Sequence, residues 1–300
     1  MRVLQAKNAI ALFITLVFVM VITVALGFGL KQINLTSNML KDENFMYQSS
    51  MVLEDILHIL QNSPDVARVG DANSSTELFV LLSQASFIPI EVAGLDVVLK
   101  LSSARAKLNP NSLNTKGVEA LREFMGAKGV NNQYVDILLD GMGGIKADAS
   151  YNSRIFEQSP YLFRDYITSK EHFKSFNSFY AQEFNDNAVE SLAFEELFYF
   201  GGDANTTIDL NFATALTWEL LLSTTPQRAE SLAQNAGSYE NKESLGLDTT
   251  ELEKLDRFTT SFFEPILFVE LEISQEQQKA YINFEYDIKK KKGSNFVYEI

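Results

Sequence analysis

The pattern of apolar and polar positions first separates one membrane-spanning segment from the rest of the chain. Residues 9–30 (AIALFITLVFVMVITVALGFGL) carry no charge. Because about 20 apolar residues cross a bilayer as a helix, this pattern predicts a transmembrane helix over residues 10–30. Arg2 and Lys7 precede it, and basic residues favour the cytoplasmic side. We therefore expect a single-pass inner-membrane protein with a cytoplasmic N-terminus and a periplasmic C-terminal domain.

The junction between the basic leader and the apolar run resembles a prepilin processing site. The leader, residues 1–9, ends in the small residue Ala9 directly before Ile10. The resemblance implies that a prepilin peptidase cleaves between these two residues and that the mature N-terminus is methylated. The fifth mature residue is then Ile14, where most pilins have Glu. A cleaved signal peptide is an alternative, although its apolar region usually runs about 7–15 residues.

Helical spacing continues beyond the membrane segment. Residues 31–62 contain neither Pro nor Gly, and their apolar positions recur mostly at intervals of three or four. This pattern predicts a helical stalk, one face of which packs on a globular head. Pro64 follows, and because proline cannot continue a helix, the stalk is expected to end at residue 62.

Strand patterns occur at the two ends of the head. Residues 87–101 are rich in β-branched side chains around a central Ala-Gly pair, which predicts a hairpin. Residues 282–288 alternate apolar and polar side chains and predict a half-buried strand, with further strands at 265–273 and 296–300. The four lysines at 289–292 then form a hairpin tip, exposed to solvent or bound to anionic lipid or a partner.

These patterns predict an α+β fold with an insertion. The sheet is assigned to residues 63–101 and to a C-terminal meander over 265–300, and the segment 102–264 between them is mostly helical by pattern. The helices expected in this insertion cover residues 117–125, 133–140, 159–169, 188–200, 212–223 and 249–262.

Two short motifs in the insertion echo each other. Residues 107–114 (KLNPNSLN) and 209–215 (DLNFATA) each place an Asn at a turn, with Ser or Thr able to cap the apolar helix that follows. Both motifs resemble those of the K-type minor pseudopilins of type II secretion (general secretion pathway protein K). Members of that family also lack Glu at the fifth mature position, which is Ile14 here. We expect Asn109 and Asn211 to stabilise structural turns.

This resemblance implies a pilin-like fold, in which a long N-terminal helix packs on a small antiparallel sheet that carries a large helical subdomain. It further implies a non-enzymatic role, in which the chain initiates or caps a periplasmic pseudopilus for protein export. The implied partners are other minor pseudopilins, docked through the stalk, together with the inner-membrane secretion platform and the prepilin peptidase. Ile14 suits a tip position, because the Glu of other pilins helps each subunit dock below a neighbour. The alternatives are a pseudopilin of a DNA-uptake or type IV pilus machine, and a membrane-tethered periplasmic enzyme or ligand-binding sensor.

Composition restricts the chemistry further. The net charge of −14 argues against direct contact with nucleic acid. The chain has no cysteine, which excludes disulfides, thiolate metal sites and thiol nucleophiles. Its only histidines are His58 and His172, so a site that needs several histidines is not expected. Asp203 and Asp209 could offer oxygen ligands to calcium, although their spacing fits no EF-hand loop. We expect no other cofactor.

Overall fold

The computed structural model describes residues 41–92, 94–200 and 206–299. A helix over residues 41–62 comes first, followed by α2 (Pro64–Ala72), α3 (Ser75–Gln84), β1 (Ile88–Val92), β2 (Leu95–Ser103), η1 (Pro110–Ser112), α4 (Thr115–Ala127), α5 (Gln133–Met142), α6 (Ile155–Gln158), α7 (Lys170–Phe184), η2 (Ala188–Ser191), α8 (Phe194–Leu197), β3 (Ile208–Asp209), α9 (Ala215–Leu222), α10 (Pro226–Gln234), η3 (Glu243–Leu245), α11 (Thr249–Leu255), β4 (Thr260–Ser261), β5 (Ile266–Gln275), β6 (Gln278–Asp287) and β7 (Lys292–Glu299).

Five strands form an antiparallel sheet in the order β1-β2-β5-β6-β7. Across the central strands, Leu99 lies opposite Leu271, which lies opposite Ile282. Directly opposed residues share one face of a sheet, and these three are buried. The alternation of buried and exposed positions along β2 and β5 thus gives the sheet one apolar face.

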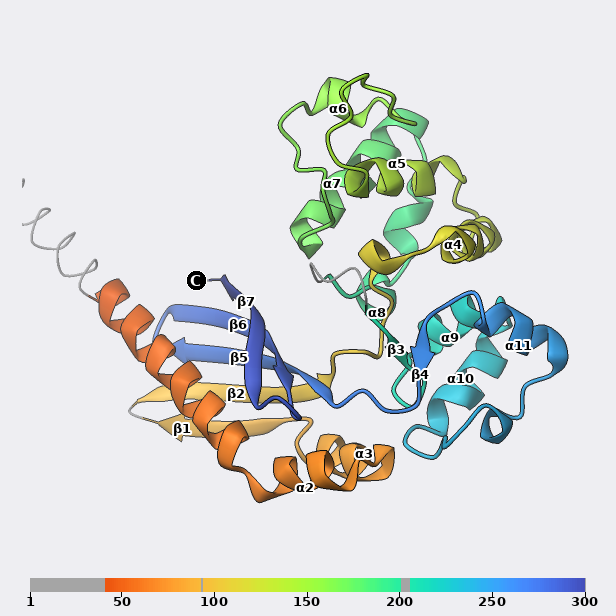
Figure 1. The fold of residues 1–300 in the computed structure, drawn as a ribbon. Coiled ribbons are helices and arrows are strands. Elements are labelled where there is room, and N and C mark those ends of the chain that lie inside the picture. The colour runs from red at the N-terminus through yellow and green to blue at the C-terminus, as the bar shows by residue number, and fades with distance from the viewer. Residues whose placement is uncertain (1–40, 93, 201–205, 300) are drawn as a thin grey trace, which may run out of the picture.

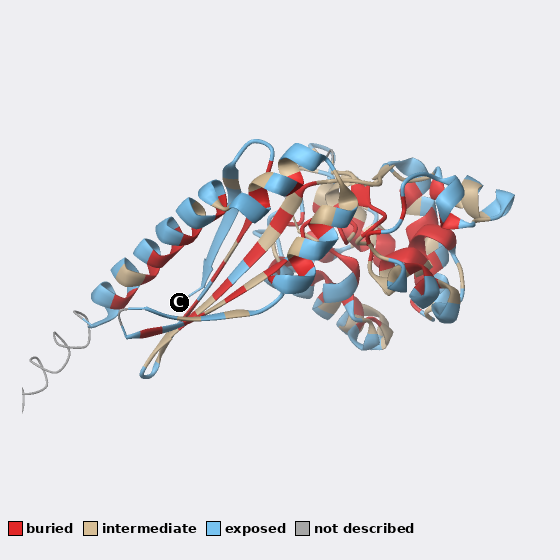
Figure 2. Cartoon of the chain, turned by 90° about the horizontal axis from the view of Figure 1, so that it is seen from below, coloured by how far each residue is buried: buried red, intermediate tan, exposed pale blue. Residues whose placement is uncertain are grey.

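The helix over residues 41–62 covers this apolar face (Figure 1). Its buried side chains include Phe45, Val52, Ile56 and Leu60, which recur at helical spacing. In Figure 2 the buried positions of this helix lie along the side that faces the sheet. The helix ends at residue 62, as predicted. Pro64 then takes the first position of α2, where a missing N–H costs nothing, and the Ser63 side chain accepts a hydrogen bond from the Val66 backbone N–H.

The segment between β2 and β5 folds into a helical body with a hydrophobic core of its own, distinct from that of the sheet (Figure 1). Trp218, Tyr134, Tyr180 and Phe176 are fully buried in it, and edge-to-face aromatic contacts such as Tyr134–Tyr180, 5.3 Å between ring centroids, fill its centre. The short parallel pair β3–β4 lies where the chain passes between this body and the sheet.

The structure confirms the α+β class, the hairpin β1–β2 and the C-terminal meander β5–β6–β7. Several helix predictions are wrong. Residues 159–169 form turns rather than a helix, and the helix begins instead at α7, where the Ser169 side chain accepts a hydrogen bond from the His172 backbone N–H. The predicted helix over 188–200 is interrupted between η2 and α8, and the one over 249–262 ends at Leu255. Helices α2, α3, α6 and α10 were not expected from the sequence pattern.

Several predictions fall on residues that the structure does not describe. The leader 1–9, the transmembrane helix 10–30, Ile14 and Asp203 lie outside the described residues. Of the stalk, only the helix from residue 41 onward is described. Within the described ranges, no helix combines the length and the hydropathy that a bilayer crossing requires.

Candidate assembly surface

Strand β7 lies at the open edge of the sheet and exposes large apolar side chains. Phe296, Val297 and Tyr298 are 40%, 41% and 49% exposed. Tyr298 lies opposite the buried Ile282, so it belongs to the face that the N-terminal helix covers, whereas Val297 lies opposite Asn283 on the other face. An exposed apolar edge strand with unpaired backbone groups is a surface on which another chain can dock.

An irregularity in β6–β7 pairing directs one of these aromatic rings. The register shifts between Asn283 and Glu285, and Asn295 adopts a left-handed conformation with φ 54°. Its side-chain amide donates to Glu285 Oε1 at 2.7 Å. The bulge stacks the Phe296 ring on buried Phe284, with 5.1 Å between centroids. One face of the Phe296 ring therefore packs on the core, while the side chain stays 40% exposed.

One flank of the N-terminal helix runs beside β7. At the C-terminal end of the helix, Gln61 Nε2 donates to the Lys291 carbonyl at 3.4 Å. At its first described turn, Asp42 Oδ1 accepts from Gln278 Nε2, at the start of β6, at 2.6 Å. Because β7 is antiparallel to β6, β7 runs back from Lys291, beside Gln61, toward the N-terminal half of the described helix.

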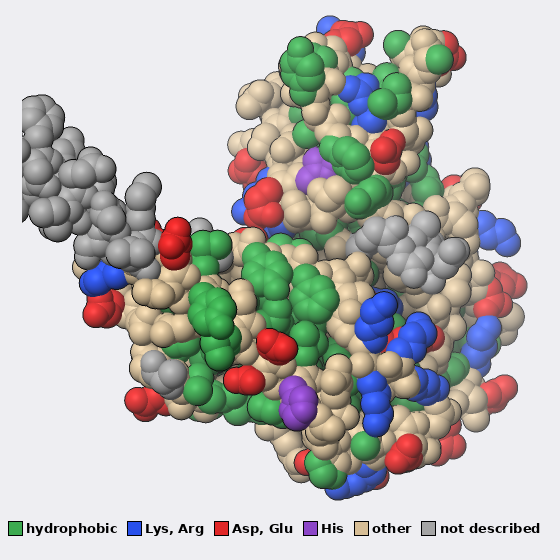
Figure 3. Space-filling view, turned by 60° about the vertical axis from the view of Figure 1, so that its left-hand side comes forward, with side chains coloured by type: hydrophobic (Ala, Val, Ile, Leu, Met, Phe, Trp, Pro, Cys, Tyr) green, Lys and Arg blue, Asp and Glu red, His purple; other side chains and the backbone are tan. Residues whose placement is uncertain are grey.

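Met46 extends the apolar surface onto this helix. It shares a helix face with Leu57 and Gln61, because the three positions are separated by whole turns, and it is 49% exposed. Figure 3 shows hydrophobic side chains gathered on one face of the molecule. We call Met46, Phe296 and Tyr298, with Val297 on the reverse side of the strand, the β7 surface.

A buried charge cluster joins the β7 edge to the helical body. Arg105 Nη2 lies 2.8 Å from Glu285 Oε2, and their side chains are only 9% and 4% exposed. The Tyr199 hydroxyl also donates to Glu285, and the Arg105 guanidinium stacks 5.2 Å from the centre of the Tyr199 ring. Because Arg105 and Tyr199 belong to the insertion, this cluster fixes the insertion against the sheet directly behind the β7 surface.

The two Asn residues singled out in the sequence lie in buried turns. The Asn109 side chain accepts a hydrogen bond from the Asn111 backbone N–H at 3.0 Å at the start of η1. Asn211 Oδ1 accepts from Tyr239 N–H at 2.8 Å, and its Nδ2 donates to the carbonyls of Tyr239 and Phe262 at 2.8 and 2.7 Å. Asn211 therefore joins three chain segments, and the Asn109 side chain caps the start of η1. Their effect on stability stays a prediction.

Asp209, a predicted calcium ligand, uses both of its carboxylate oxygens within the fold. Oδ1 accepts from Asn211 N–H at 3.0 Å and Oδ2 accepts from Glu264 N–H at 2.8 Å. Burial raises the pKa of this carboxyl group to about 7, against the opposing effect of the two backbone N–H groups. The second candidate ligand, Asp203, lies outside the described residues. In the part of the chain that the structure describes, no three acidic, His or Cys side chains gather at one point.

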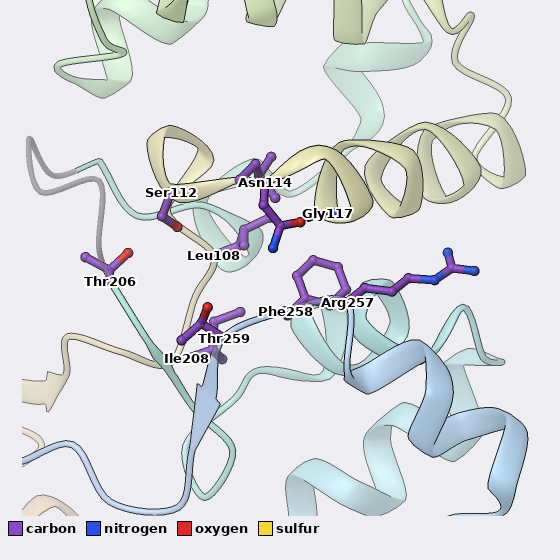
Figure 4. Close-up of a pocket in the computed structure, with 10 residues that line it drawn as sticks. Leu108, Ser112, Asn114, Gly117, Thr206, Ile208, Arg257, Phe258 and Thr259 are labelled. Atoms are coloured by element: carbon purple, nitrogen blue, oxygen red, sulfur yellow. Dashed lines mark hydrogen bonds between the residues drawn. The ribbon is translucent and has the colours of Figure 1, made fainter.

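One hollow in the helical body has room for little more than a water molecule. It holds about 20 Å³ and lies between the start of α4 and the segment that follows α11 (Figure 4). Asn114, Gly117 and Phe258 line it, and the Asn114 side chain is already engaged in capping α4. This hollow therefore offers no space for a substrate.

The β7 surface and the Arg105–Glu285 pair were not predicted from the sequence. The available signal for the surface was the run of three consecutive apolar residues at 296–298, which breaks the alternation expected of an edge strand. For the buried pair the sequence held no local signal, because its two charged residues are separated by nearly the whole insertion.

No protein-family model and no curated protein matches the chain. Among solved structures, the chain is similar to a chain in the structure of the GspK-GspI-GspJ complex from the type 2 secretion system of enterotoxigenic Escherichia coli, with a TM-score of 0.56 and 12% sequence identity. The similarity covers 87% of this chain and 97% of that one, so it includes both the sheet and most of the helical insertion. At this identity, what the two chains share is the fold.

Proposed function

We propose that this protein is a minor pseudopilin that initiates or caps a periplasmic pseudopilus in a type II secretion system. The observation that carries the proposal is the similarity in fold to a chain of the GspK-GspI-GspJ complex over nearly the full length of both chains. The two Asn motifs, at Asn109 and Asn211, and the large insertion between β2 and β5 support the K-type family in particular.

The proposed role is assembly rather than catalysis. The β7 surface supplies a contact area made of exposed aromatic and apolar side chains beside a helix. Aromatic residues and Met are enriched at protein interfaces. Its proposed partners are other minor pseudopilins, with the secretion platform holding the complex at the inner membrane. No cofactor is required for this role.

Membrane insertion and processing belong to the same proposal. The apolar residues 10–30 anchor the protein in the inner membrane with the head in the periplasm, and prepilin peptidase removes residues 1–9. Mass spectrometry of the membrane fraction should then find a methylated mature chain that begins at Ile10. A chain that retains Met1, or one that begins beyond Leu30, contradicts the pilin-type processing.

Site-directed crosslinking tests the assembly role. The chain has no cysteine, so each single-cysteine variant carries one defined attachment point for a photoreactive crosslinker. Met46→Cys and Tyr298→Cys place it on the β7 surface. Tyr161→Cys, at a side chain that is 99% exposed on the helical body, is the matched control.

We expect the two β7-surface variants to crosslink, in native membranes, to a small fixed set of other pilin-like subunits, and the control variant to give no such products. Crosslinks between copies of this chain along a filament would make it a shaft subunit and contradict the tip position. Equal products from all three positions would show that the β7 surface is not the interface.

A further inference from the structure

The turn between β6 and β7 carries the densest positive charge in the sequence. Lys289, Lys290, Lys291 and Lys292 follow one another in a chain whose net charge is −14, and all four are exposed. Lys and Arg side chains gather in one area of the face that Figure 3 shows. We refer to residues 289–292 as the lysine turn.

Local contacts explain the first two lysines of the turn but not Lys291 and Lys292. Lys291 has a φ of 52°, a left-handed conformation that favours Gly, Asn or Asp over a long side chain. Lys290 pairs with Asp287 at 3.0 Å, and Lys289 Nζ lies 5.3 Å from the centre of the Phe263 ring. Among the described residues, Lys291 and Lys292 form no salt bridge. Their positive charges therefore repel each other without a neighbouring carboxylate to offset the repulsion. A sequence that works against its own turn points to a role outside folding.

The lysine turn is held firmly against the end of the N-terminal helix. Gln61 donates to the Lys291 carbonyl, and a Cβ on Gly293 would lie 3.0 Å from the Leu57 side chain and 2.6 Å from the Phe296 ring. A larger residue at position 293 would have to displace one of these side chains. The helix and strand therefore present Lys291 and Lys292 from a fixed position, which lowers the entropy cost of binding.

The geometry also separates the lysine turn from the membrane. The turn lies level with residue 61, and the helix from residue 41 to this point is about 30 Å long at 1.5 Å per residue. The surface field of anionic lipid decays within about 8 Å at physiological salt. With the chain anchored through residues that precede the helix, as in the proposed function, the lysines lie several decay lengths away from the bilayer.

We propose that the lysine turn is a docking site for an acidic segment of a periplasmic partner protein, rich in Asp and Glu. This inference rests on the proposed function for the direction of the membrane. The lysine turn lies at one end of β7 and the Met46–Tyr298 part of the β7 surface near the other, so the two sites can be occupied together. The partner then contacts this protein at the end of β7 that lies farther from the membrane.

Binding of a fluorescent deca-glutamate peptide to the full chain in zwitterionic nanodiscs tests the proposal. The variant K291Q/K292Q removes two charges from the turn, and K116Q/K174Q removes two exposed charges from α4 and α7 as the matched control. We expect the turn variant to bind the peptide about tenfold more weakly at low salt, as two lost charge pairs imply, and the control to bind like the wild type.

Two further measurements identify the class of ligand. Vesicles with and without phosphatidylglycerol measure lipid binding, and the crosslinks from Met46→Cys, repeated in the K291Q/K292Q background, report pseudopilin assembly. Equal weakening in both double variants, or no peptide binding by the wild type, overturns the proposal. So does selective loss of anionic-vesicle binding in K291Q/K292Q, which would make lipid the ligand. If peptide binding depends on the turn while the crosslinks are absent in every background, the proposed function fails and the acidic-segment site remains.

Discussion

Replacing Glu285 by Gln removes one partner of the charge pair that joins the helical insertion to the sheet, and leaves the other buried. The Arg105 side chain is 9% exposed and Glu285 is its only salt-bridge partner among the described residues. Removal of one member of such a pair leaves an uncompensated charge and costs about 3–5 kcal/mol. We expect a loss of that size for Glu285→Gln, and a similar loss for Arg105→Met, which leaves the carboxylate unpaired.

The double variant should be milder than either single change. With both charges gone, no buried ion remains, and replacement of a whole buried pair by apolar groups is often neutral. We therefore expect Arg105→Met/Glu285→Leu to unfold within about 2 kcal/mol of the wild type. The rotational freedom of the Tyr199 hydroxyl, which donates to Glu285, lets it find another acceptor or water.

Urea unfolding can follow the two bodies separately. Trp218 is the sole tryptophan and is fully buried in the helical body, so its fluorescence reports that body, while circular dichroism reports the whole chain. The single variants Arg105→Met and Glu285→Leu complete the cycle with the double variant. If the loss in the double variant equals the sum of these two single losses, Arg105 and Glu285 are energetically independent and the proposed coupling of the pair is refuted.

Four further predictions concern other parts of the molecule. Asn211→Leu leaves three backbone groups without their partner, each costing about 1–3 kcal/mol, and should lower the urea midpoint, whereas an unchanged midpoint with lost assembly would show a functional role. Asp209, whose pKa is raised to about 7, contributes stability that is complete below about pH 4 and declines by roughly 4 kcal/mol as pH rises through 7, because ionisation is easier in the unfolded chain; the same pH dependence of stability in the wild type and in Asp209→Asn would contradict this. Lys291→Gly should raise stability by about 0.5–1 kcal/mol while weakening deca-glutamate binding, and a destabilised variant would show that the left-handed lysine is not strained. Ile14→Glu should fail to insert or lose its tip position, since a carboxylate near the bilayer centre costs about 2.5–3.5 kcal/mol, whereas Ile14→Leu should assemble normally, both measured by membrane fractionation and crosslinking.

Strands were predictable where their side chains alternate and their turns are short. The hairpin around Gly94 and the meander of β5, β6 and β7 satisfy both conditions, and their register follows from burial of one face. The same rule failed at Glu285, which the alternation assigns to the solvent side. It is only 3% exposed because Arg105 and Tyr199, far away in the sequence, cover it.

Helix predictions failed mainly at helix boundaries and where start signals were overlooked. Pro64 was interpreted only as the end of one helix, although Ser63 before it is a capping residue and the pair equally marks the start of α2. Residues 159–169 have apolar side chains at helical spacing, yet there the chain turns and Ile167 is bonded to the Asn111 side chain. Such tertiary hydrogen bonds leave no periodic signal in a sequence.

The insertion between neighbouring strands has a consequence for the order in which the protein forms during synthesis. Ser103 at the end of β2 pairs with Leu267 near the start of β5, although about 160 residues separate them. At roughly 5–20 residues per second, translation takes on the order of 8–30 s to supply the strand that β2 needs. Until then β1–β2 is a lone hairpin, which is marginally stable in water. Early folding of the helical body would bring the two strand ends together and shorten the loop that must close, whose entropy cost grows with its length. Variants that slow the folding of the helical body should therefore increase aggregation of nascent chains, even where the finished protein is stable.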